Sequence, residues 1–441
     1  MSLLIKGGIV VNEAHSFLAD LLIEDGRIKN VLRPGTTPRD AYQEMIDVTG
    51  CFVLPGVIDE HVHFREPGIT AKADIHTESM AAAAGGVTSF LEMPNTNPQT
   101  TTSDALQEKY RLAAEKSVVN FGFFYGATSL NADSFAAVPR SMIPGIKLFM
   151  GASTGNMLVD KQESLERIFA TCHDLQLPLM THCEETALIN QNMRKAMAVY
   201  GEDPEISMHP EIRSAEACYA SSALAVELAQ KYDTRLHIAH VTTARELTLA
   251  GSNVSLEACV PHLLFSDEDY LTKHALIKCN PAVKTANDRD QLRQALADGR
   301  IFTIATDHAP HLWEEKQGGA RKALSGMPMV QFSLVSMLGL VDKGVLSIEQ
   351  LVTLMCHHPA SLFKIRQRGF IREGYWADLA IVQRTEPWIV DKQVILSKCN
   401  WSPLEGDSLN WKVRATFCNG SWVNRQGCVD ATHRGQQLIF G

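Results

Sequence analysis

The central part of the chain, from about Gly56 to Arg368, alternates short apolar runs with longer segments of helical periodicity. Short apolar runs are typical of buried strands, whereas apolar residues that recur every three or four positions indicate helices. The eight apolar runs are Val57–Ile58, Val87–Met93, Val119–Tyr125, Ile143–Phe149, Leu177–Met180, Arg235–Ala239, Val254–Cys259 and Ile301–Ala305. The helical segments between them include Ala105–Glu115, Gln162–His173, Ile212–Lys231 and Asp288–Ala297. Eight β/α units predict an α/β fold of the (β/α)8 (TIM) barrel type rather than an open, doubly wound sheet.

Both ends of the chain carry a different pattern, in which apolar and polar positions alternate with a period of two, as in half-buried strands. The segments with this pattern are Leu3–Val11, Ala19–Val31, Ala377–Val382, Trp411–Cys418 and Ser421–Val423. Asn419-Gly420 predicts a hairpin turn between the last two. We therefore expect the two ends to fold together as a small β-sandwich domain. The predicted boundaries are residues 1–54 and 369–441 for this domain, and residues 55–368 for the barrel.

The composition is that of an ordinary soluble globular protein, with 45% hydrophobic and 21% charged residues among 441. The formal net charge of -9 predicts neither nucleic acid nor an anionic membrane as a partner. We find no apolar stretch of about 18 residues, and the N-terminal segment lacks the pattern of a secretory signal. The ten cysteines contain no Cys-x-x-Cys pair, so we expect free thiols and a cytoplasmic location.

Histidines and one aspartate stand at the ends of several predicted strands. His61 and His63 end the first strand, and side chains two residues apart in a strand point to the same side. Such a pair by itself is more often structural than metal-binding. However, His182, His240 and Asp307 follow strands five, six and eight. Because barrel enzymes place their active sites at the carboxyl ends of the strands, we predict that all five side chains converge there and can bind zinc.

Lys147 lies at the end of predicted strand four, within the apolar run Ile143–Phe149. Burying an ammonium ion is costly, and the alternative is that the side chain extends until its amine reaches water. Burial lowers the pKa of a lysine, and a neutral amine can react with carbon dioxide to form a carbamate. A carbamate is an anion with two oxygens that could bridge two metal ions. With the other candidate ligands at the same end of the barrel, we favour the bridging interpretation.

Six residues resemble, in order and strand position, the metal ligands of the binuclear zinc branch of the amidohydrolase superfamily: His61, His63, Lys147, His182, His240 and Asp307. The segment Gly374–Leu379, which re-enters the β-domain, also resembles a motif of that superfamily. The resemblance covers nearly the whole chain. It implies two zinc ions per subunit, the more buried one held by the first two histidines and the aspartate. The next two histidines would hold the other ion, and N6-carboxylated Lys147 would bridge both.

Residues next to these ligands resemble dihydroorotases more narrowly. Arg65 follows the histidine pair and Asn95 lies in Met93–Thr96; in that family these two residues hold the substrate carboxylate. A guanidinium group suits a carboxylate because it can donate two parallel hydrogen bonds. The alternative is a structural salt bridge from Arg65 to Glu66 or Asp59. The resemblance implies further substrate contacts from His63, Asn280, His311, Ser325 and Gly326.

Two segments depart from the dihydroorotase pattern. Ala282-Val283-Lys284 stands where the family often has Pro-Leu-Arg, and Met327–Gln331 stands where it often has a Gly-x-Glu stretch. These departures concern closure around the substrate and not the metal ligands. His308 and the remaining histidines are expected to be structural or on the surface, although His262 follows strand seven at the same end of the barrel.

The resemblance implies a dihydroorotase, which reversibly hydrolyses the cyclic amide of (S)-dihydroorotate to N-carbamoyl-L-aspartate in de novo pyrimidine (UMP) biosynthesis. A hydroxide bridging the two zinc ions would attack the ring carbonyl, with Asp307 as general acid and base. We expect this small molecule as the only partner besides a second copy of the chain, in a homodimer. The alternatives are an allantoinase, a hydantoinase (dihydropyrimidinase)-type cyclic amidase, a catalytically silent dihydroorotase-like scaffold, and a zinc-free barrel with coincidental histidines.

Overall fold

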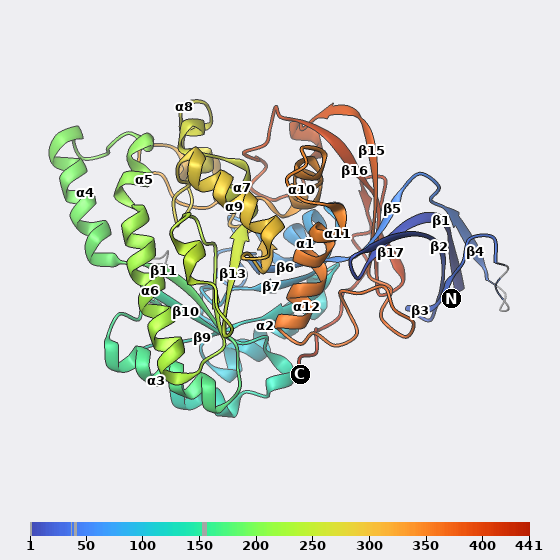
Figure 1. Cartoon of the computed structure of the whole chain (residues 1–441), viewed down its shortest axis with the longest axis horizontal. Coiled ribbons are helices and arrows are strands. Elements are labelled where there is room, and N and C mark those ends of the chain that lie inside the picture. The colour runs from blue at the N-terminus through green and yellow to red at the C-terminus, as the bar shows by residue number, and fades with distance from the viewer. Residues whose placement is uncertain (1, 37, 39–41, 152–156) are drawn as a thin grey trace.

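Parallel strands form the centre of the molecule, and helices surround them (Figure 1). The computed structural model describes residues 2–36, 38, 42–151 and 157–441. The central strands are β6 (Val57–Val62), β7 (Val87–Glu92), β8 (Asn120–Phe123), β9 (Tyr125–Gly126), β10 (Ile146–Gly151), β11 (Leu179–Glu184), β12 (Leu236–Ile238), β13 (Val254–Cys259) and β14 (Thr303–Ala305). Neighbouring central strands pair in parallel. The predicted α/β barrel is confirmed.

Two joints close the barrel. The third predicted strand is split at Phe124 into β8, which pairs with β7, and β9, which pairs with β10. The Phe124 N–H donates to the Glu92 carbonyl at 3.1 Å, and the Tyr125 N–H donates to the Gly145 carbonyl at 3.3 Å. At the other joint the His63 N–H donates to the His308 carbonyl at 2.7 Å. The ends of the first and last strands are therefore neighbours.

Helices cover the outside of the barrel because each buries one apolar stripe against the strands. Their ends follow local signals: the side chains of Thr102, Ser214 and Thr285 accept hydrogen bonds from the first turns of α2, α6 and α9. The helices are α1 (Ile75–Ala84), α2 (Ser103–Lys116), α3 (Gln162–Asp174), α4 (Thr186–Tyr200), α5 (His209–Ile212), α6 (Ala215–Tyr232), α7 (Val260–Leu264), α8 (Tyr270–Lys273), α9 (Ala286–Asp298), α10 (Ser333–Asp342), α11 (Ile348–Val352) and α12 (His358–Leu362).

The two ends of the chain fold together beside the barrel, as predicted, and their strands form one nine-stranded sheet (Figure 1). Its strands are β1 (Ser2–Asn12), β2 (His15–Glu24), β3 (Arg27–Leu32), β4 (Glu44–Asp47), β5 (Phe52–Pro55), β15 (Leu379–Ile389), β16 (Ser408–Cys418), β17 (Ser421–Arg425) and β18 (Cys428–Val429). β5 and β15 join the two ends by antiparallel pairing, with Leu379 opposite Pro55. A separate apolar core draws residues from both ends, including Leu3, Ile23, Leu379 and Phe417.

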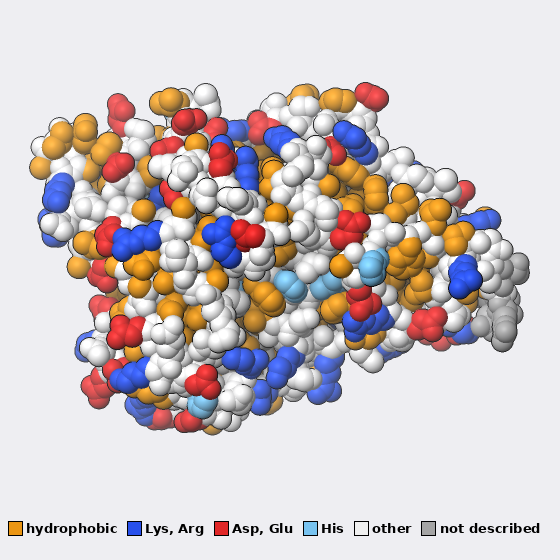
Figure 2. Space-filling view, viewed as in Figure 1, with side chains coloured by type: hydrophobic (Ala, Val, Ile, Leu, Met, Phe, Trp, Pro, Cys, Tyr) orange, Lys and Arg blue, Asp and Glu red, His pale blue; other side chains and the backbone are white. Residues whose placement is uncertain are grey.

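The surface and the cysteines bear on the expectations about partners and redox state. Figure 2 shows Lys and Arg side chains interspersed with Asp and Glu over the face in view. In the part of the chain that the structure describes, no helix combines the length and apolar character needed to cross a membrane. All ten cysteines are described and free, and only Cys428 is exposed.

Candidate functional site

A cavity opens among the carboxyl ends of the barrel strands, where barrel enzymes carry their active sites. It is lined by His61, His63, Arg65, Asn95, Phe149, His182, His240, Asn280, Asp307, Ala309, Ser325 and Gly326. Of the predicted site residues, Lys147 and His311 do not line this cavity. Chain segments that are far apart in sequence thus bring most of the predicted residues to one place.

His61, His63 and Asp307 form the first group of candidate metal ligands. The Nε2 atoms of His63 and His61 lie 3.1 Å and 3.5 Å from Asp307 Oδ1. One ligand atom from each residue lies within 4.8 Å of the others. Burial lowers the pKa of both imidazoles.

Hydrogen bonds on the far side of each ring orient the two histidines. His61 Nδ1 lies 2.8 Å from Glu257 Oε1, and His63 Nδ1 lies 2.8 Å from Asn95 Oδ1. Since both oxygens are acceptors, each Nδ1 is the protonated nitrogen and each Nε2 keeps its lone pair. The two lone pairs face Asp307, which is the arrangement in which an outer acceptor fixes the tautomer of a metal-binding histidine.

His182, His240 and Lys147 form the second group. His182 Nδ1 and His240 Nε2 face each other at 2.9 Å. Lys147 is 0% exposed, so its amine does not reach water. Its Nζ has no hydrogen-bond partner among the described residues, and burial lowers its pKa. A buried amine without a hydrogen-bond partner fits the bridging interpretation, because a carbamate formed on it could bind metal ions.

The donor atoms of both groups are of the kinds that zinc binds, namely imidazole nitrogen and carboxylate oxygen. Other metals accept the same donors. The geometry therefore fits a metal ion among His61, His63 and Asp307.

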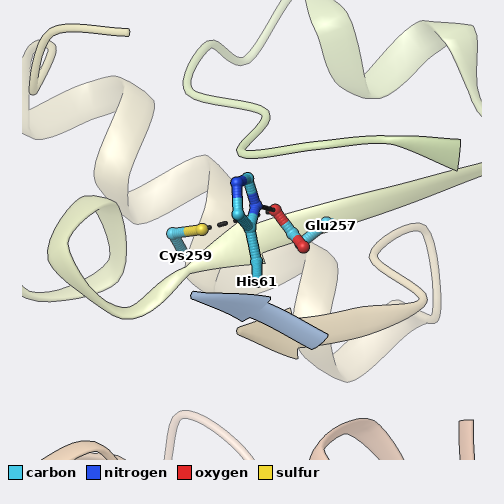
Figure 3. A group of neighbouring side chains, drawn as sticks. All are labelled: His61, Glu257 and Cys259. Atoms are coloured by element: carbon cyan, nitrogen blue, oxygen red, sulfur yellow. Dashed lines mark hydrogen bonds and ion pairs between the residues drawn. The ribbon is translucent and has the colours of Figure 1, made fainter. Parts of the chain in front are cut away.

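Glu257 is a functional residue that the sequence analysis missed. It lies on β13, and its Oε1 accepts hydrogen bonds from His61 Nδ1 at 2.8 Å and from the His240 N–H at 2.7 Å. Figure 3 shows its carboxylate on one side of the His61 ring and the Cys259 thiol on the other. The Cys259 thiol donates to Glu257 Oε1 at 3.4 Å. The available signal was a charged residue inside the apolar run Val254–Cys259, the same signal that singled out Lys147.

A second buried carboxylate lies deeper in the barrel. Glu60 Oε1 is 2.9 Å from His237 Nε2 and accepts the Thr303 hydroxyl at 2.5 Å. The other nitrogen of His237 is 2.8 Å from Ser255 Oγ. Burial, and then the neighbouring Glu257, raise the pKa of Glu60 well above its usual value. These hydrogen bonds connect neighbouring strands of the barrel, and His237 has a structural role in them.

Three residues of the site have backbone conformations that L residues rarely adopt. The φ angles of Arg65, His240 and Asp307 are 68°, 40° and 48°. Positive φ is uncommon for residues other than glycine, and such strain is concentrated at functional sites. Each residue lies two or three positions after the end of a barrel strand, in the turn out of that strand, and its side chain lines the cavity.

Arg65 has neither of the salt bridges considered as alternatives. Its Nε donates to the Pro310 carbonyl at 3.0 Å, and its second guanidinium nitrogen lies 3.1 Å from His311 Nε2. Among the described residues no carboxylate lies within ion-pair distance of it. Glu66 pairs instead with Lys116, and Asp59 accepts the Thr306 hydroxyl. A buried guanidinium without an acidic partner is left at the wall of the cavity.

His311 lies behind this wall. Its Nε2 is 2.9 Å from the Ser325 carbonyl, and its Nδ1 is 3.1 Å from Lys72 Nζ. Burial, and then the charges of Arg65 and Lys72, lower its pKa, so the ring is neutral. Asn280 also lines the cavity, and its Oδ1 is buried without a hydrogen-bond partner within the described residues. An unpartnered amide oxygen in a cavity is available to a ligand.

The two remaining histidines near the strand ends are held by the protein. His308 Nε2 is 2.8 Å from Glu78 Oε2, and its Nδ1 accepts the Met329 N–H at 3.0 Å. His262 Nε2 donates to the Pro281 carbonyl at 3.0 Å. The departing segment Met327–Gln331 thus supports His308. In the other departing segment, Lys284 Nζ donates to the Ala282 carbonyl at 2.9 Å.

Comparisons with known proteins show the family of this chain. The family model described as "Amidohydrolase family" matches residues 52–423. The chain belongs to the amidohydrolase family. Within this family it is 31% identical to the dihydroorotase of Methanosphaera stadtmanae, over 93% of this chain and 94% of that protein. It is also 30% identical to the allantoinase of Bacillus velezensis, over 96% of this chain and 94% of that protein. The solved L-hydantoinase (dihydropyrimidinase) of Arthrobacter aurescens superposes with a TM-score of 0.93 at 28% identity, over 99% of each chain.

Proposed function

We propose that this amidohydrolase is a zinc-dependent dihydroorotase acting on the cyclic amide of (S)-dihydroorotate. The observation that carries the proposal is Arg65, a buried guanidinium at the wall of the cavity without an acidic partner among the described residues. A site that buries such a charge favours a substrate that brings a carboxylate. Dihydroorotate carries one, whereas allantoin and hydantoin do not.

Two zinc ions would be held by His61, His63 and Asp307 and by His182 and His240, with carboxylated Lys147 between them. Bound there, they would acidify a water molecule to near neutrality and polarise the amide carbonyl. Asp307 would accept a proton and return it to the ring nitrogen as the ring opens. Asp307 lines the cavity, where its carboxylate can reach a bound ligand.

The carboxylate of the substrate would lie against Arg65 and Asn95. The Asn95 oxygen is occupied by His63 Nδ1, which leaves the amide nitrogen of Asn95 as a donor. His311 would keep the guanidinium in place, while Asn280, Ser325 and Gly326 would contact the ring. We further propose a cytoplasmic homodimer, and the domain division 1–54, 55–368 and 369–441.

The second candidate is an allantoinase or hydantoinase, and the relatives at similar identity support it. Assays of zinc-loaded protein with dihydroorotate, allantoin and hydantoin side by side separate the two. We expect kcat/KM for dihydroorotate to exceed the others by at least about 100-fold, because an unpaired buried charge penalises a neutral ligand. A preference for allantoin or hydantoin would reject the proposal. Protein that holds no zinc and turns over none of the three would instead indicate the silent scaffold.

A further inference from the structure

Lys316 is a buried lysine near the cavity, although it does not line it. It ends the short 3-10 helix Trp313–Lys316 and is 2% exposed. Its Nζ donates to three backbone carbonyls: those of Lys278 at 3.1 Å, Leu324 at 2.8 Å and Gly326 at 2.7 Å. No carboxylate of the described residues lies within ion-pair distance of it. The side chain is therefore a buried cation satisfied by backbone oxygens alone.

The three acceptors define the charge of Lys316. An amine in its neutral form has only two N–H groups, and its lone pair would face the third carbonyl oxygen. Burial lowers the pKa of this lysine, but the hydrogen-bond geometry requires the ammonium form. A cation that is buried without a counter-ion is expensive for the fold. A leucine or methionine would fill the same space at less cost, so the ammonium needs another explanation.

The carbonyls that Lys316 binds belong to the two segments that carry three proposed substrate contacts. The Lys278 carbonyl lies two residues before Asn280, and the Leu324 and Gly326 carbonyls flank Ser325. The Lys278 carbonyl also accepts the Gly326 N–H at 2.8 Å. One ammonium therefore ties the segment of Asn280 to the loop of Ser325 and Gly326.

His311 is linked to the same two segments. The His311 ring lies 2.9 Å from the Ser325 carbonyl, and its own carbonyl accepts the indole N–H of Trp401 at 2.8 Å. The Trp401 ring in turn packs over Lys316 Nζ, 5.7 Å from its centroid. Gly326 is closely packed, since a Cβ there would lie 2.5 Å from the Ala309 carbonyl. The loop has little room to move as long as these contacts hold.

We propose that Lys316 is a positioning residue that holds Asn280, Ser325 and Gly326 in place for the substrate. The inference rests on the proposed function, because those three residues are substrate contacts only if the cavity is the active site. Within the described residues, Lys316 has no hydrogen bond or ion pair with a candidate metal ligand. Its loss should therefore weaken substrate binding and leave the metal centre intact.

The test compares Lys316→Met, which keeps the stem and removes all three donors, with the exposed-lysine control Lys343→Met. Lys316→Gln, with two N–H donors, serves as a milder change if Lys316→Met does not fold. The first measurement is hydrogen exchange of peptides that cover Leu324 and Gly326. Their amides bond to the carbonyls of Glu315 and Lys278, both at 2.8 Å. We expect faster exchange there in the Lys316 variants and no change in the control.

The second measurement is the steady-state kinetics of the zinc-loaded variants with dihydroorotate. We expect KM to rise by about 10-fold or more, kcat to stay within about threefold and the zinc content to be unchanged. Lys316→Gln should give a KM between those of the wild type and Lys316→Met. An unchanged KM, or a fall in kcat alone, would overturn the proposal even if exchange increases. If the wild-type protein does not turn over dihydroorotate, the proposed function is wrong. Unchanged hydrogen exchange at Leu324 and Gly326 in the Lys316 variants would separately show that Lys316 does not position these residues.

Discussion

His61 Nδ1 lies 2.8 Å from Glu257 Oε1, and the same oxygen accepts the His240 N–H at 2.7 Å. One carboxylate oxygen on β13 thus contacts a candidate ligand from each of the two groups. It orients the ring of His61, and it satisfies the backbone of His240 at its unusual φ of 40°. Glu257 belongs to neither group, yet both depend on it.

Replacing Glu257 with Ala should lower zinc affinity by about 10- to 100-fold, because the His61 ring loses the acceptor that sets its tautomer. Competition with a chromophoric chelator measures this directly. Glu246→Gln is the matched control, since Glu246 is also buried but its carboxylate accepts hydrogen bonds from Ser222 and Thr243. Equal affinities in wild type and Glu257→Ala would contradict the orienting role.

Lys147→Ala should lose both zinc and activity, because the amine that would carry the bridging carbamate is gone. A small carboxylic acid in the buffer should restore part of both by supplying two oxygens in the vacated space. Zinc content and turnover are measured with and without the acid. A metal-replete, active Lys147→Ala protein would show that the bridge assignment is wrong.

Asp307→Asn should reduce turnover by about 100- to 10,000-fold, the range expected for a general acid and base. Asparagine has the same shape but cannot take up the proton. Thermal unfolding checks that the fold persists, and turnover is compared at equal zinc content because Asp307 is also a candidate metal ligand. Turnover at the wild-type level would exclude Asp307 from proton transfer.

Arg65→Met should lower kcat/KM for dihydroorotate by about 10- to 100-fold, the value of hydrogen bonds to a charged group. Arg65→Lys should recover only part of the loss, because lysine keeps the charge without the planar fork. Both replacements have a Cβ, so the strain of the positive φ is the same as in the wild type. If Arg65→Met and Arg65→Lys bind dihydroorotate as tightly as the wild type, the substrate carboxylate does not contact Arg65.

The sequence carried enough information for the barrel and most of the proposed site. Strand ends could be placed from apolar runs, and the carboxyl ends of parallel strands meet at one face of a barrel. His61, His182, His240 and Asp307 could therefore be grouped before any contact was known. Arg65 was harder, because a charged side chain beside Asp59 and Glu66 has local partners available. In the structure Asp59 accepts a hydrogen bond from Thr306 and Glu66 pairs with Lys116. Arg65 lies at the wall of the cavity instead.

The sequence alone determined the His-x-His pair, the order of the strands and the position of Lys147 within an apolar run. These features follow from local periodicity and from the order of residues along the chain. Only the tertiary structure decided that Glu257 holds His61 and that Lys316 joins the segments of Asn280 and Gly326. Hydrogen bonds are directional and act over about 3 Å. Which donor meets which acceptor across distant segments therefore depends on how the strands and loops pack, and no spacing in the sequence expresses it.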